Sequence, residues 1–229
     1  MFPLTQSEYH ALLLSLQVAA TAVCIALPLA LPVAYLLARR PWRFLWLLET
    51  FVNLPLVLPP VVTGFFLLWL FSPAAPFGAV LATLGIHVTF TWLGAALAAA
   101  VVSFPLMVRA VRLGFAHVDP RLELAAQSLG ASRCDSFCSI TLPLAARGIL
   151  GAMVLGFARS LGEFGATIMV AGNIPGQTQT IPLAIFSLSQ RPGGLEQTGT
   201  LVLLSVGLAC GALLISEGLE ARYRRHEVR

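Results

Sequence analysis

The chain contains no lysine, and charged residues of all kinds make up only 10% of its 229 residues. Soluble domains carry about 25% charged residues. Because 58% of this chain is hydrophobic, its composition excludes an ordinary soluble domain and indicates an all-α integral membrane protein. The missing lysine also excludes an ATP-binding P-loop, whose pattern G-x4-G-K-[ST] requires that residue. Any step driven by ATP therefore needs another polypeptide.

The chain also has few cysteines and histidines. Its four cysteines are scattered, and the pair Cys134 and Cys138 has no second Cys or His pair nearby to complete a tetrahedral zinc site. Neither a Ser/His/Asp nor a Cys/His arrangement stands out around the four histidines. We therefore expect no metal site, no cofactor bound by this chain and no enzymatic activity of its own.

Long uncharged runs take the place of the missing charges. The stretch from Thr50 to Val108 has no charged residue and is long enough for two crossings of about 20 residues each, separated by a turn with two prolines at 72–78. A shorter apolar piece, Ile181 to Leu188, is expected to be re-entrant or interfacial, with a sixth crossing as the alternative. The hydrophobic runs predict one membrane domain over 1–229, with a core at about 11–217 and five crossings: 11–38, 50–71, 89–110, 145–171 and 197–217.

The positions of the arginines predict the orientation. On the five-crossing count, twelve of the fourteen basic residues fall on one side of the membrane, Arg191 falls on the other, and Arg159 lies inside a crossing. The positive-inside rule then places the N-terminus outside and the C-terminus in the cytoplasm. Arginines at the cytoplasmic face also contact anionic lipid, so the net charge of +4 requires no nucleic-acid partner.

A polar segment, residues 119–142, separates the third and fourth crossings on the cytoplasmic side. Asp119 and Pro120 predict a helix start, and Gly130 suits the left-handed position that ends this helix. Ser132 followed by Asp135 resembles a capping box that begins a second short helix. The first helix has one apolar face, formed by Leu122, Ala125, Ala126 and Leu129. These patterns predict two short surface helices, which either pack on the bundle of the same chain or dock to another protein.

The spacing in this segment, A-A-x3-G-x9-I-x-L-P, resembles the cytoplasmic signature of permease subunits of binding-protein-dependent ABC importers. In that family the two short helices are coupling helices that dock into a groove on the ATPase subunit. The family's acid usually directly precedes the two alanines, where this chain has Leu124. Glu123 stands one place earlier, a position at which members of the molybdate branch also have an acid. The resemblance thus implies ATPase coupling by Glu123, Ala125, Ala126, Gly130, Ile140, Leu142 and Pro143.

Three further blocks extend the resemblance over most of the chain. The stretches 53–68, 103–115 and 156–186 resemble molybdate permeases, and the Gly-Glu-Phe-Gly block at 162–165 is shared with sulfate permeases. The resemblance implies a type I importer fold, a homodimer, a cytoplasmic ATPase that binds the ATP, and a periplasmic or lipid-anchored oxyanion-binding protein. Sulfate or tungstate transport is the alternative. An ion-coupled secondary transporter is less favoured, because neither repeated halves nor an evident ion site is visible.

Arg159 and Glu163 place opposite charges four residues apart inside the fourth predicted crossing. Charges are costly in lipid, so both side chains should face protein or water. Helical rise counted from Arg147 puts them about 18 and 24 Å deep, where an outer gate would lie. Gly162 and Gly165 would then allow two copies of this helix to cross closely. A purely structural ion pair is the alternative interpretation.

Overall fold

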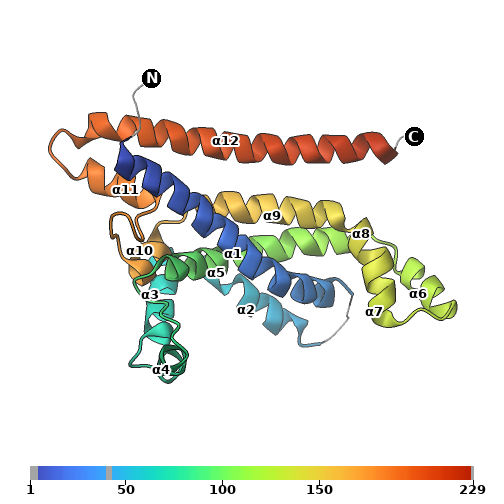
Figure 1. The fold of residues 1–229 in the computed structure, drawn as a ribbon. Helices are drawn as coiled ribbons and strands as arrows, with labels where there is room; N and C mark the ends of the chain where they lie inside the picture. The colour runs from blue at the N-terminus through green and yellow to red at the C-terminus, as the bar shows by residue number, and fades with distance from the viewer. Residues whose placement is uncertain (1–4, 40–42, 228–229) are drawn as a thin grey trace.

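The structure is a computed structural model that describes residues 5–39 and 43–227. Over these residues it is helical, with no β-strand, as the sequence predicts (Figure 1). The elements in chain order are α1 (Gln6–Arg39), α2 (Leu45–Val57), α3 (Pro60–Phe71), α4 (Pro76–Thr83), α5 (Trp92–Ala116), α6 (Pro120–Ser128), α7 (Arg133–Ser136), the π-helical turn η1 (Phe137–Thr141), α8 (Leu142–Leu144), α9 (Ala146–Leu161), α10 (Gly165–Ala171), α11 (Ile181–Ser189) and α12 (Gly194–Glu227). Two arginines used in the orientation argument, Arg40 and Arg229, lie outside the described residues.

The core of the molecule is the packing of α5 between α1 and α9. Both α1 and α5 contribute alanines to this core, each at most 4% exposed: Ala22, Ala26, Ala30 and Ala34 on α1, and Ala95, Ala96, Ala99 and Ala100 on α5. Lipid tails are as apolar as leucine, so burial alone does not drive helices together within a membrane. Small residues allow close van der Waals contact between backbones, which explains a core built from alanine.

Glycines set the closest approach between α5 and α9. A Cβ added to Gly148 would lie 2.5 Å from the Cα of Gly114, and one added to Gly114 would lie 2.9 Å from the Cα of Gly148. Any larger residue at either position would therefore force the helices apart. This crossing lies close to the junction between the bundle and the polar segment.

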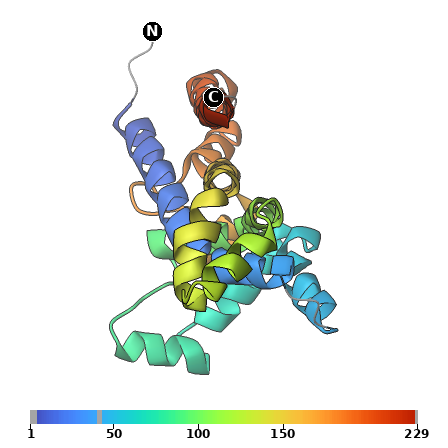
Figure 2. The ribbon, with the colours of Figure 1, turned by 90° about the vertical axis from the view of Figure 1, so that its right-hand side faces the viewer.

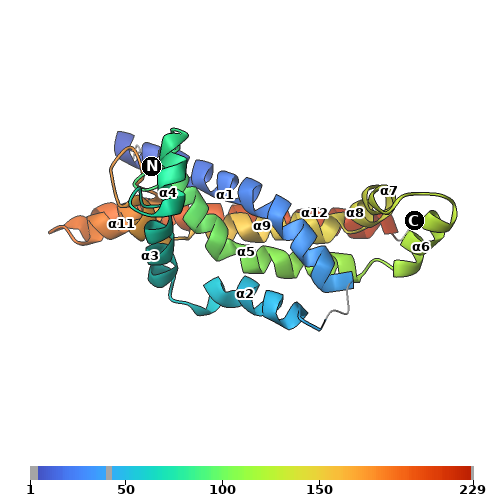
Figure 3. The same cartoon turned by 90° about the horizontal axis from the view of Figure 1, so that it is seen from below.

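The predicted crossing 50–71 is divided into two helices. It consists of α2 and α3, which meet at 109°, and α3 turns away from the common direction of α1, α5 and α9 (Figure 3). The adjacent prolines explain the break, because a residue before proline is pushed to extended backbone. Leu58 and Pro59 accordingly have ψ of 143° and 133°. The following turn is at 72–75 and leads into α4, which the sequence analysis did not predict.

The predicted crossing 145–171 is also interrupted. Helix α9 ends at Leu161, and α10 begins at Gly165. The depth of about 24 Å expected for Glu163 from an unbroken helical rise therefore does not apply. The other predicted runs match helices, with boundary shifts: α5 continues six residues past 110, and α12 extends beyond 197–217 in both directions.

Helix lengths limit the number of crossings. Three stretches of the described chain are long and apolar enough to span a membrane: Gln6–Arg39, Trp92–Ala116 and Thr198–Ile215. The number rises to five if each bent pair, α2 with α3 and the 133–144 helices with α9, forms one span. The beginning of α1 lies at one end of the molecule, and the end of α12 points toward the other, the end that carries α6 and α7 (Figure 1).

Two elements lie at the edges of the bundle. Seen from the end that carries α6 and α7, α12 and α4 lie on opposite sides of the central helices (Figure 2). Helix α12 contacts α11 and α9 and leaves Leu203 and Leu214 more than 70% exposed. Exposed leucines on a peripheral helix suit a surface that faces lipid or another membrane helix.

Candidate functional site

The first helix of the polar segment begins and ends at the residues that the sequence predicts. The Asp119 carboxylate accepts a hydrogen bond from the backbone N–H of Arg121 at 2.9 Å, and Pro120 is the first residue of α6. Gly130 follows the helix with a φ of +97°, in the left-handed region that glycine adopts without strain. Local capping therefore defines α6.

The second helix is longer than the capping pattern indicates. The Ser132 hydroxyl accepts a hydrogen bond from the N–H of Asp135 at 3.1 Å, as predicted, and the helical turns then run on to Leu144. This stretch contains Ile140, Leu142 and Pro143, and it joins α9 at a bend of 68°. The polar segment is thus continuous with a membrane helix, and a movement of one can reorient the other.

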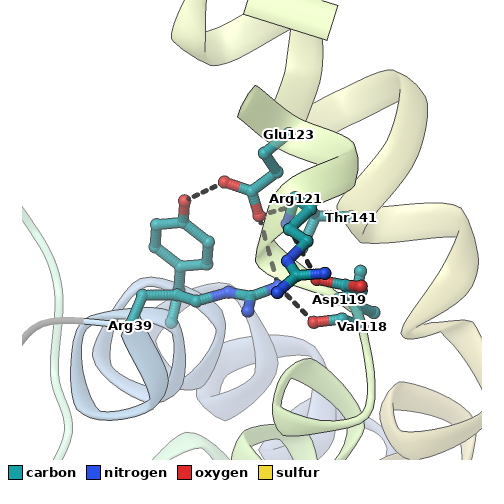
Figure 4. A network of polar contacts seen from close by, with 7 residues as sticks. Arg39, Val118, Asp119, Arg121, Glu123 and Thr141 are labelled. Carbon is teal, nitrogen blue, oxygen red and sulfur yellow. Dashed lines mark hydrogen bonds and ion pairs between the residues drawn. The ribbon is translucent and has the colours of Figure 1, made fainter. Parts of the chain in front are cut away.

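Glu123 is at the centre of a network inside the chain (Figure 4). Its carboxylate accepts hydrogen bonds from the Tyr35 hydroxyl at 2.9 Å and from the Thr141 hydroxyl, and it pairs with Arg39 at 3.4 Å. The same Arg39 donates to the carbonyl of Val118 at 2.9 Å. The Glu123 side chain is 13% exposed and that of Arg39 is 11% exposed. Glu123 therefore ties α1, α6 and η1 together.

The other residues of α6 leave much of the helix surface uncovered. No residue of α6 is fully buried, Leu124 is 61% exposed, and Leu129, just after the helix, is 91% exposed. Ala125 is also exposed. Packing on the bundle of the same chain accounts for Glu123 but not for these apolar side chains. The face that they form is open to a partner.

Arg159 and Glu163 form the ion pair that their spacing predicts, at 2.7 Å. The Glu163 side chain is 2% exposed and that of Arg159 is 31% exposed. Glu163 lies beyond the end of α9, and its carboxylate also accepts a hydrogen bond from the N–H of Ala166 at 2.9 Å. Glu163 thus neutralises Arg159 in the last turn of α9 and caps the start of α10.

The two glycines near this pair have different surroundings. A Cβ on Gly165 would lie 2.9 Å from the Cβ of Pro60, so this glycine permits contact with α3 of the same chain. A Cβ on Gly162 would have no atom within 4 Å. Gly162 instead borders an apolar cavity of about 610 Å³ between α9, α11 and α12. Its carbon-rich lining, which includes Leu161 and Phe164, does not suit an anion.

Comparison with known proteins agrees with this architecture. A family model described as "Binding-protein-dependent transport system inner membrane component" matches residues 26–216. The chain belongs to this family. One relative, the "Molybdenum transport system permease protein ModB" of Haemophilus influenzae, is 49% identical over 219 residues, which cover 95% of this chain and 96% of that protein. The "Sulfate transport system permease protein CysT" of Escherichia coli (strain K12) is 39% identical over 85% of this chain and 70% of that protein.

A solved structure shares the fold at much lower sequence identity. It is the "Crystal structure of bacterial alginate ABC transporter in complex with alginate pentasaccharide-bound periplasmic protein". The alignment covers 96% of this chain and 80% of that chain, with a TM-score of 0.74 at 15% identity. The importer-type helical fold expected from the sequence is therefore confirmed, and family membership also makes the chain an inner-membrane component.

Sequence reasoning missed the partners of Glu123. Tyr35 lies 88 positions before Glu123, and Thr141 lies 18 positions after it. A helical pattern indicates neighbours only three or four residues apart. The polar residues Tyr35 and Arg39 at the end of an alanine-rich helix are a weak signal that this end meets something polar, but they do not identify the carboxylate.

Proposed function

We propose that this chain is the permease subunit of an ABC importer that moves molybdate across the inner membrane with ATP hydrolysed by a separate subunit. The proposal rests on one observation: the chain is 49% identical in sequence to a molybdenum permease, and the match covers nearly the whole of both chains. The chain itself is non-catalytic in this scheme. The chain forms one domain, residues 1–229 with a core at about 11–217. Two copies of it form a homodimer that encloses the transport path.

A transport assay tests the substrate. Cells that lack other importers would express the chain with its ATPase and its oxyanion-binding protein, which is periplasmic or lipid-anchored. We expect uptake of labelled molybdate that excess molybdate suppresses and equal sulfate does not. Stronger competition by sulfate or tungstate would assign the transporter to that anion, as the likeness to a sulfate permease makes possible. Uptake driven by an ion gradient without the ATPase would instead indicate a secondary transporter.

The polar segment supplies the docking surface for the ATPase in this proposal. The supporting observation is the open apolar face around Ala125, Leu129 and Gly130, in a chain that has no lysine for a P-loop. Ala126, Ile140, Leu142 and Pro143 shape the same two helices. Glu123 has a different role from direct docking, because its carboxylate is occupied within the chain. It holds the docked helices to α1, so that a movement of these helices also moves α1 within the membrane.

Cysteine crosslinking tests the docking surface. Cys134 and Cys138 are exposed in the same segment, so both would first be replaced by serine. Leu129→Cys or Ala126→Cys should then capture the ATPase subunit in membranes, with a yield that changes when ATP is added. Gln190→Cys, an exposed position after α11 at the other end of the molecule, is the matched control and should capture no ATPase. No capture from either of the first two positions would refute the docking surface.

The Arg159–Glu163 pair belongs to the gate region of the path. The two side chains neutralise each other, so they do not form a tight anion-binding site. This supports the role, because an ion that binds too tightly in a transport path is not released. Gly162 has free space around it in one chain, and this supports a crossing with a second copy there. Gly162→Val should lower uptake if the copies meet at this position. Gly151→Val, at another α9 glycine with free space, is the control.

In the proposed orientation the N-terminus is outside and the C-terminus is cytoplasmic, with five crossings. The opposite positions of the start of α1 and the end of α12 support an odd number of crossings. Reporter fusions at both termini measure the orientation directly. A C-terminal reporter that is active outside the cell would require a sixth crossing and would place the arginine-rich tail on the wrong side.

A further inference from the structure

Two cysteines of the polar segment have no role in the sites described above. Cys134 lies in α7 and Cys138 lies in the π-helical turn η1, and both are exposed. Between them, Ser136 and Phe137 have right-handed helical backbone, with φ/ψ of −58°/−39° and −65°/−49°. The two cysteines are therefore one regular helical turn apart, and their side chains leave the same face of the helix.

The other side of this turn is packed against the chain. Ser136 is fully buried. The ring of Phe137 lies 5.0 Å from the ring of Tyr35 and 5.8 Å from the ring of Phe115, measured between centroids. These contacts with α1 and α5 fix which way the turn faces, so the two thiols are held together on the surface that the bundle leaves open.

Helical geometry limits how the two sulfurs can be joined. Cβ atoms one turn apart on a helix are about 5–6 Å apart, whereas a disulfide needs a Cβ–Cβ distance of about 3.5–4.5 Å. A direct bond between the sulfurs would therefore distort the turn that Phe137 anchors. An ion that lies between the sulfurs and binds both of them spans the larger distance with the turn intact.

The number of available ligands selects the ion. Thiolates are soft ligands that favour Cu(I), zinc and iron–sulfur clusters. A structural zinc ion and an iron–sulfur cluster each take four protein ligands, but the described part of the chain has no group of three or more His, Cys, Asp or Glu side chains that could hold a metal. Cu(I) is satisfied by two thiolates in a nearly linear arrangement, so it needs no further ligand here.

We propose that Cys134 and Cys138 form a two-thiolate site for Cu(I) on the polar segment. Each thiol gives up its proton and its sulfur donates a lone pair to the ion, so the copper stays monovalent and no oxidant or reductant is consumed. This site is distinct from the tetrahedral zinc site that the sequence excludes. In the proposed orientation the segment faces the cytoplasm, where thiols stay reduced.

The site has a consequence for docking, and this part of the inference rests on the proposed function. Helix α7 contacts α6, whose apolar face is open, at one end of the molecule (Figure 1). Two thiolates around Cu(I) add one net negative charge beside that face. A bound ion should therefore weaken docking of the ATPase and lower uptake.

A binding titration tests the site itself. The purified full-length chain would be titrated anaerobically with Cu(I) against a colorimetric Cu(I) chelator, and we expect one ion held per chain. Cys134→Ser and Cys138→Ser should each lose this binding, because a single thiolate leaves the ion half coordinated. The matched control is Cys24→Ser/Cys210→Ser, which removes the exposed cysteines of α1 and α12 and should bind like the unmodified chain. Binding that survives in Cys134→Ser/Cys138→Ser would refute the site.

Alkylation mapping tests the same site without any substitution. N-ethylmaleimide should modify both Cys134 and Cys138 in the metal-free chain, and one equivalent of Cu(I) should protect both, as read by peptide mass spectrometry. Unchanged modification of either cysteine would overturn the proposal.

Transport separates this inference from the proposed function. The complete transporter, with its ATPase and binding protein, would be assayed in proteoliposomes with Cu(I) on the ATPase side. Cu(I) should lower molybdate uptake several-fold in the unmodified transporter and should not lower it in Cys134→Ser/Cys138→Ser. If the metal-free transporter took up no molybdate, the proposed function would fall and the titration would still decide the site. If Cu(I) bound and uptake did not change, the overlap with the docking surface would be refuted.

Discussion

Glu123 and Glu163 are both nearly buried carboxylates paired with arginine, but they join different parts of the chain. Glu163 contacts Arg159 and Ala166, four residues before it and three after it. Glu123 contacts side chains on α1 and η1 that lie up to 88 positions away. Loss of Glu163 therefore disturbs one helix junction, whereas loss of Glu123 disconnects a surface helix from the bundle.

In the proposed transporter this difference gives the two acids different roles. The acid at the α9–α10 junction would act in the gate region of the path. The acid on α6, which lies where the polar segment meets α1, would act on how a movement of that segment is passed to the bundle. Variants of the first should change the rate of passage, and variants of the second should change the number of anions moved per ATP.

The largest effect is expected from Glu163→Gln. The amide can still accept the N–H of Ala166, so the start of α10 is kept, but Arg159 loses its counter-charge. A lone charge in a membrane span costs roughly 2.5–3.5 kcal/mol, so molybdate uptake should fall tenfold or more with abundance near normal. Uptake and immunoblots of the same membranes measure both quantities.

The double variant Arg159→Gln/Glu163→Gln is the control for this prediction. It removes both charges and should transport better than Glu163→Gln alone, because no unpaired ion remains. Unchanged uptake in Glu163→Gln would remove the pair from the gate.

An intermediate effect is expected from moving the acid on α6. The double variant Glu123→Leu/Leu124→Glu moves the acid to the place directly before the two alanines, but Leu124 is 61% exposed, whereas the Glu123 side chain is 13% exposed and bonded within the chain. We expect ATP hydrolysis to continue and the molybdate moved per ATP to fall roughly threefold or more, since several hydrogen bonds are lost. Both rates would be measured in proteoliposomes. Normal coupling in this variant would show that the acid acts by contacting the ATPase. The bonds of Glu123 to α1 and η1 would then be unimportant for coupling.

The smallest effects are expected from the neutral partners of Glu123. Tyr35→Phe and Thr141→Val each remove one donor to the carboxylate, which costs about 1–3 kcal/mol in a buried setting. The Tm of the purified permease should fall by a few degrees, with only a modest loss of coupling. Tyr9→Phe, on an exposed tyrosine of α1, should leave the Tm unchanged. An equal shift in the control would mean that the assay does not report on this network.

Much of the fold and part of the candidate site are predictable from sequence, because the relevant physics is local. Asp119 and Gly130 define the two ends of α6 through their own backbone conformation and the nearest amides. Arg159 meets Glu163 because about one helical turn separates them. The sequence predicts the place of the break after Leu58 but not its geometry. Adjacent prolines favour a kink, but its angle of 109° depends on how α3 packs against α10.

The sequence by itself determined the membrane class, the helical runs, the caps of the polar segment and the local ion pair, since each depends on composition or on residues within one or two turns. Only the tertiary structure decided that Glu123 binds Tyr35 and Thr141, that Gly148 lies against Gly114, and that Arg109 rests on Asn53. These contacts join helices far apart in the chain. Their partners depend on the crossing of whole helices, which no local pattern specifies.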